Sequence, residues 1–108
     1  MPTDGAPLKP VPLPPDAAVL RLVCESLDGL DAQALRDRLL NLAGVESVAI
    51  DLYARTVDLY LDRTRATAPH LVALARERVR LPVRTAELHR APEKGQPLGA
   101  ATLIFVVQ

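Results

Sequence analysis

The sequence has 108 residues, and its 13 lysine and arginine side chains balance 13 aspartate and glutamate side chains, so the formal net charge is zero. This balance argues against a general affinity for nucleic acid or for an anionic membrane surface. The single cysteine, Cys24, excludes an internal disulfide and any metal site within one chain that needs several thiolates.

Residues 1–16 form a proline-rich arm, with prolines at positions 2, 7, 10, 12, 14 and 15. Proline fixes φ and lacks a backbone donor, so we expect an extended or polyproline II segment outside the core. Within this arm, Lys9–Pro15 fits the basic-x-x-Pro-x-x-Pro pattern that SH3-type grooves bind. A plain linker or a strap over the sheet is the competing interpretation.

The first strand is predicted at Ala17–Ser26, because Leu20, Leu22 and Cys24 alternate along it and share one face. Cys24 is interpreted as a small core residue, since free cysteine behaves as a buried hydrophobe. A reactive thiol would need a base or a helix N-terminus beside it, and neither is adjacent to Cys24 in the sequence.

A first helix is predicted to begin after Asp31, a natural N-cap that follows the turn signal Asp28-Gly29. Its apolar stripe and its stop signal come at helical spacing: Leu35, Leu39, Leu42 and then Gly44. The segment Gly44–Leu61 then contains two runs of alternating apolar residues around Ala54–Thr56, which predict an antiparallel hairpin with one apolar face. That apolar face must be covered, and the helices predicted before and after the hairpin in the sequence can cover it.

A second helix is predicted after an N-cap at Thr67, with Pro69 in its first turn and Pro82 at its end. Its apolar stripe consists of Leu71, Leu74, Ala75 and Val79. Val83–His89 follows as the fourth strand, and after a loop at 90–99 the apolar segment Ala100–Val107 is predicted to be a fifth strand.

The order β-α-β-β-α-β is typical of an α+β ferredoxin-like sandwich, in which two helices cover one face of a sheet ordered 4-1-3-2. The predicted organisation is an arm at 1–16, a ferredoxin-fold domain at 17–90, and a loop with an additional C-terminal strand at 91–108. We expect that strand to pair antiparallel with the fourth one. Its exposed apolar side chains predict a homodimer, since one symmetric contact covers them on both copies.

The segment Asp31–Leu61 resembles the heavy-metal-associated (HMA) domain, the fold of copper chaperones and of metal-binding modules of P-type ATPases. In that family, apolar residues lie four, eight and eleven positions after the second metal-binding cysteine, and Gly-Val-x-x-Val follows. Here Leu35, Leu39 and Leu42 stand at those distances from Asp31, and Gly44–Val48 reads GVESV. The resemblance covers roughly Val19–Leu88 and implies a metal-trafficking or docking module.

The metal motif of the family is missing. The two cysteine positions hold Asp28 and Asp31, the methionine position holds Ser26, and Cys24 stands four residues too early. Because Cu(I) takes thiolate ligands, we expect no metal site of the family's kind and no cofactor. The two aspartates remain candidate ligands for Ca²⁺ or Mg²⁺, ions that take about six oxygen ligands.

The topology places Asp28 and Asp31 at the end of the sandwich that also holds Arg55 and Arg80, so a guanidinium is predicted to stand in for the missing cation. His70 and His89 are expected at the opposite end as solvated surface residues. We further expect five arginines to serve an acidic protein partner, against the alternative of a solvated helix end: Arg55, Arg76, Arg78, Arg80 and Arg84.

The function favoured by these patterns is a non-catalytic HMA-like module that acts in protein–protein interaction or in docking related to metal trafficking. An ACT-like regulatory module that binds a small molecule near Leu27–Leu30 is the alternative. An RNA-recognition module would need aromatics on a basic sheet face, whereas the third strand carries Asp58 and Asp62 beside Tyr60. Because no nucleophile–base pair can be assembled, we expect no enzyme. The charge balance predicts no nucleic-acid or membrane partner. The sequence starts without a signal-peptide pattern and has no apolar stretch of ~18 residues, so we expect a cytoplasmic location.

Overall fold

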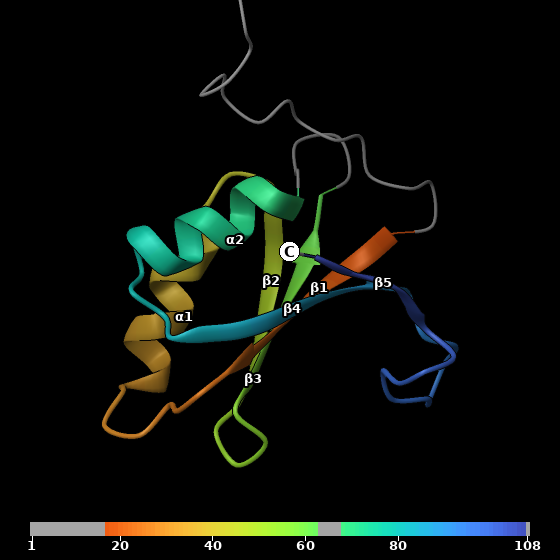
Figure 1. Cartoon of the computed structure of the whole chain (residues 1–108), viewed down its shortest axis with the longest axis horizontal. Coiled ribbons are helices and arrows are strands. Elements are labelled where there is room, and N and C mark those ends of the chain that lie inside the picture. The colour runs from red at the N-terminus through yellow and green to blue at the C-terminus, as the bar shows by residue number, and fades with distance from the viewer. Residues whose placement is uncertain (1–16, 63–67, 108) are drawn as a thin grey trace, which may run out of the picture.

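The computed structural model describes residues 17–62 and 68–107 of the chain. The elements in chain order are β1 (Ala17–Cys24), α1 (Ala32–Leu40), β2 (Val45–Asp51), β3 (Thr56–Leu61), α2 (Ala68–Glu77), β4 (Val83–Arg90) and β5 (Leu103–Val107). All neighbouring strands pair antiparallel in one five-stranded sheet, and the predicted α+β class is confirmed (Figure 1). The proline-rich arm with Lys9–Pro15 and the predicted cap Thr67 lie outside the described residues.

The strand order is β2-β3-β1-β4-β5. It differs from the predicted 4-1-3-2, because the predicted list left out the fifth strand; read from the β5 edge, the observed order is β5-β4-β1-β3-β2. The predicted antiparallel pairing of the C-terminal strand with β4 is confirmed. This strand begins at Leu103 rather than Ala100, because the backbone N–H groups of Thr102 and Leu103 both donate to the carbonyl oxygen of Gly99 in a turn.

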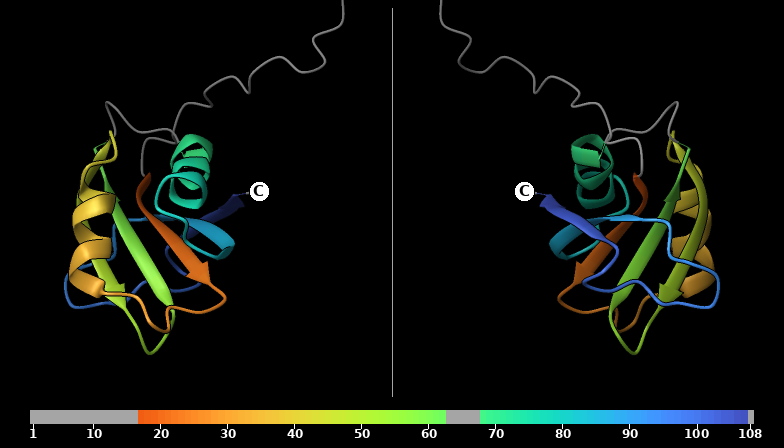
Figure 2. Two further views of the ribbon diagram at one scale, coloured as in Figure 1. Left: turned by 90° about the vertical axis from the view of Figure 1, so that its left-hand side faces the viewer. Right: turned by 90° about the vertical axis from the view of Figure 1, so that its right-hand side faces the viewer.

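Both helices lie on the same face of the sheet, α1 over β2 and α2 over β4 (Figure 2). The core lies between them and consists of the alternating apolar residues of the strands and the apolar stripes of the helices. Its fully buried members include Leu20, Leu22, Leu39, Leu59, Leu71 and Leu88. None of the described helices is long and apolar enough to cross a membrane.

The opposite face of the sheet carries two rows of directly paired residues on its three central strands. One row is Tyr60–Val19–His89 and the other is Asp58–Arg21–Glu87. The connection between β4 and β5 runs over this face (Figure 2). Val19 and His89 are buried on this face, although both described helices lie on the other one. His89 contacts the connection through Thr102.

Candidate functional site

One end of the domain brings together the loop after β1, the β2–β3 turn and the start of β4. The N–H of Cys24 donates to the carbonyl of Arg55 at 2.9 Å, and the N–H of Glu25 donates to the carbonyl of Pro82 at 2.9 Å. The guanidinium of Arg55 donates in turn to the carbonyl of Glu25 at 3.2 Å. These bonds hold the loop that carries Asp28 and Asp31 at the end of the domain that also holds Arg55, as the sequence predicts.

Asp31 is the N-cap of α1, as predicted. Its carboxylate accepts hydrogen bonds from the N–H groups of Gln33 at 3.0 Å and Ala34 at 3.3 Å. Asp28 is exposed, and its own N–H donates to the Oγ atom of Ser26 at 3.1 Å. One of the two candidate carboxylates is therefore already used to satisfy the open end of the helix.

The predicted ion pair between these aspartates and Arg55 or Arg80 is wrong. Within the described residues, no nitrogen of either guanidinium lies within 4.0 Å of an oxygen of Asp28 or Asp31. The reason is local, because the Arg55 side chain binds a backbone carbonyl instead. Arg80 has a φ of 62° in the connection after α2 and is exposed.

No group of three or more His, Cys, Asp or Glu side chains that could hold a metal ion is present among residues 17–62 and 68–107. Cys24 lies in the core with 3% of its surface exposed, which confirms its interpretation as a core residue. Burial raises the pKa of the Cys24 thiol, so the thiolate is disfavoured. This cysteine is neither exposed nor activated for metal transfer.

The five predicted arginines all have exposed side chains. Arg55 is in the β2–β3 turn, Arg84 is in β4, and the other three lie in and after the last turns of α2. Arg76 also donates to the carbonyl of Val83 at 3.3 Å, which ties α2 to the start of β4. The same end carries the exposed carboxylates of Glu25 and Asp28, so its surface charge is mixed rather than uniformly basic.

His70 is exposed, as predicted, but the prediction for His89 is wrong. His89 has only 2% of its surface exposed. Its Nε2 atom lies 2.9 Å from Oε1 of Glu87, and its Nδ1 atom lies 2.8 Å from Oγ1 of Thr102. No local pattern around His89 predicts this burial, because the imidazole is covered by the β4–β5 connection, which folds back over the sheet.

A second polar pair crosses the same face. Arg21 of β1 donates from Nε and Nη2 to the two carboxylate oxygens of Asp58 in β3, at 2.8 and 2.9 Å. These hydrogen bonds raise the pKa of Arg21 above its ordinary value. The alternation of the strands contained the signal, since both residues occupy positions opposite to the apolar face.

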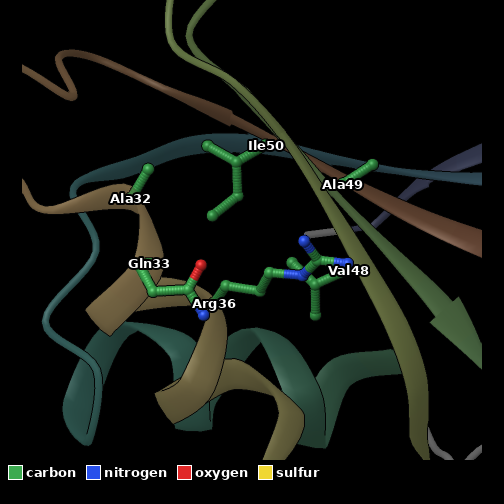
Figure 3. Close-up of a pocket in the computed structure, with 6 residues that line it drawn as sticks. All are labelled: Ala32, Gln33, Arg36, Val48, Ala49 and Ile50. Atoms are coloured by element: carbon green, nitrogen blue, oxygen red, sulfur yellow. The ribbon is translucent and has the colours of Figure 1, made fainter.

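A cavity of about 380 Å³ opens between the first two turns of α1 and the middle of β2 (Figure 3). Four apolar residues, one amide and one cation line it, and Arg36 extends from α1 toward β2. Its lining residues are Ala32, Gln33, Arg36, Val48, Ala49 and Ile50. None of these six residues was predicted to be part of a site.

Compared with known proteins, the chain matches no family model, no curated protein and no solved structure.

Proposed function

We propose that this chain is a non-catalytic module with a ferredoxin-like, HMA-like fold that docks other proteins at the end where the family carries its metal. The observation that supports this most is the state of the three candidate ligands. Cys24 is buried, Asp31 caps α1, and only the carboxylate of Asp28 is left exposed in the loop. A surface with this chemistry is suited to contact with a protein and not to the transfer of Cu(I).

The arginines at this end provide the charge for docking. Their guanidinium groups are exposed, and Arg55 binds the backbone of the loop that leads to Asp28. These groups offer planar donors for the carboxylates of an acidic partner. The carboxylates interspersed among them would select the orientation of that partner, since like charges repel. The proposed partner is therefore a protein with an acidic patch.

Self-association through β5 is part of the proposal. β5 is an edge of the sheet, and its side chains Phe105 and Val106 are 43% and 49% exposed. An uncharged edge strand with exposed apolar side chains is a template for pairing with a second copy. Light scattering measures the mass of the wild type and of the Phe105→Glu variant. We expect a dimer that the variant disrupts, because each introduced charge would face the same charge of the other copy. A wild type with the mass of one chain would refute the dimer.

A titration of the reduced chain with Cu(I) against a competing chelator distinguishes a metal-transfer function from a docking function. We expect no one-to-one retention, and Cys24→Ser is expected to change nothing. Retention that survives Cys24→Ser would overturn the proposed loss of the metal site. Thermal shift with each of the free amino acids tests the ACT-like alternative, for which a stabilising ligand is expected.

Docking is tested by affinity capture followed by titration of the purified partner. We expect a partner with an acidic patch to lose affinity for an Arg76→Glu/Arg80→Glu variant and to keep it for Arg38→Glu, whose charge lies on α1. Equal losses in both variants would show non-specific attraction and would overturn the assignment of this surface.

A further inference from the structure

We propose that the cleft between α1 and the β2 edge binds an extended peptide segment of a partner protein that carries an acidic side chain. This surface is different from the arginine-bearing end, and the proposal does not depend on the function proposed above. Two independent features support it: an edge strand that has no neighbour on its outer side among residues 17–62 and 68–107, and a cavity of about 380 Å³ directly beside that strand (Figure 3).

The backbone of β2 provides the first feature. β2 is the outermost strand on its side of the described sheet, so alternate N–H and C=O groups along it face away from β3. The middle of β2, from Ser47 to Ile50, has neither a charged residue nor a proline. Charges and prolines are two of the features by which natural edge strands prevent pairing, and the register irregularity of β2 lies before this stretch, between Val45 and Ser47. The stretch itself therefore remains open to an added strand.

The cavity provides the side-chain pocket. A strand added to β2 lies ~4.8 Å outside it and points alternate side chains toward the helix layer. There it meets the side chains of Ala32, Val48 and Ile50, which form an apolar surface for one aliphatic side chain. Ala49 points to the other face with a side chain too small to obstruct the added strand (Figure 3).

Arg36 determines the chemistry of the occupant. Among the described residues it is the only charged one that lines the cavity, and it forms no ion pair with any of them. Its neighbour Asp37 instead accepts a hydrogen bond from Gln33 at 3.2 Å. A carboxylate two positions from the aliphatic side chain lies on the same face of an extended peptide, ~7 Å further along, and reaches this guanidinium.

The test uses the full chain and a capped heptapeptide, Ser-Val-Thr-Glu-Thr-Val-Ser, which places both valines and the glutamate on one face. Its control replaces the glutamate with lysine. Amide chemical shifts locate the binding, and hydrogen exchange reports pairing of the backbone. We expect the amide chemical shifts of α1 and β2 to change and the hydrogen exchange of alternate β2 amides to slow when the glutamate peptide is added. We expect no binding of the lysine peptide.

Two charge reversals on the same helix complete the design. Arg36→Glu is expected to weaken the binding about ten-fold or more, because attraction becomes repulsion. Arg38→Glu, an equal change of charge outside the cavity, is expected to change it less than about two-fold. The proposal is overturned by equal effects of the two variants, by shifts centred on β5 or the arginine-bearing end, by no binding up to the solubility limit, or by a second copy occupying β2.

Discussion

The Nδ1 atom of His89 lies 2.8 Å from the Oγ1 atom of Thr102, and this contact joins β4 to the turn that precedes β5. Thr102 Oγ1 also accepts a hydrogen bond from the N–H of Gly99 at 2.9 Å. On the other side of the ring, Nε2 of His89 lies 2.9 Å from Oε1 of Glu87. The Thr102 hydroxyl donates to the carbonyl oxygen of Gly99 at 3.0 Å, so this one side chain links the imidazole to the backbone of the turn.

This relationship predicts that Thr102→Val destabilises the protein, because it leaves the buried Nδ1 atom and the N–H of Gly99 without their partner. We expect a loss of about 1–3 kcal/mol in the free energy of unfolding, measured by urea denaturation. Thr102→Ser keeps the hydroxyl and serves as the matched control. Equal stability of the valine and serine variants would contradict the structural role of this hydroxyl.

The pair Arg21–Asp58 predicts a strongly non-additive double-mutant cycle. Arg21→Met leaves the carboxylate of Asp58, a residue only 9% exposed, without its bidentate partner, so we expect a loss of about 2–4 kcal/mol. Adding Asp58→Leu removes the orphaned charge and is expected to restore much of that stability. Urea denaturation of the four proteins measures the coupling, and simple additivity would show that the pair is not coupled.

The two aspartates of the loop are predicted to differ in their effect on stability. Asp31→Ala removes the acceptor for two N–H groups of α1 and is expected to cost about 1 kcal/mol. The side chain of Asp28 forms no hydrogen bond or ion pair with the described residues, so Asp28→Ala is expected to change the stability by less than about 0.5 kcal/mol. The melting temperatures of the wild type and of the two variants, measured with a chelator present, test this difference. Stabilisation of the wild type by Ca²⁺ that Asp28→Ala abolishes would instead indicate a metal site.

The buried thiol of Cys24 predicts slow alkylation and a dependence of stability on alkaline pH. Burial raises the pKa of this thiol in the folded state above its value in the unfolded chain. The folded state therefore holds the proton more tightly, and the associated stability is present below about pH 8.5 and lost as the pH rises through the folded pKa. Cys24→Val is expected to reduce the slope of unfolding free energy against pH. An unchanged slope, or alkylation as fast as in urea, would show that the thiol is exposed to solvent.

Local sequence patterns determined the elements of this fold. The alternation of Leu20, Leu22 and Cys24 defined one strand and its buried face, and Asp31 marked the start of α1. The apolar C-terminal segment predicted a fifth strand and its antiparallel partner β4. These features were predictable because strand alternation and helix capping depend on residues only a few positions apart.

Only the tertiary structure decided how distant side chains meet. Arg21 and Asp58 are 37 positions apart, and their pairing depends on the register between β1 and β3, which the sequence does not specify. His89 was expected in solvent because nothing near it in sequence indicates burial, whereas the turn containing Thr102 folds back over it. The guanidinium of Arg55 reached a backbone carbonyl and not a carboxylate for the same reason. A hydrogen bond selects its partner by position in space, and position in space is set by the packing of the whole sheet.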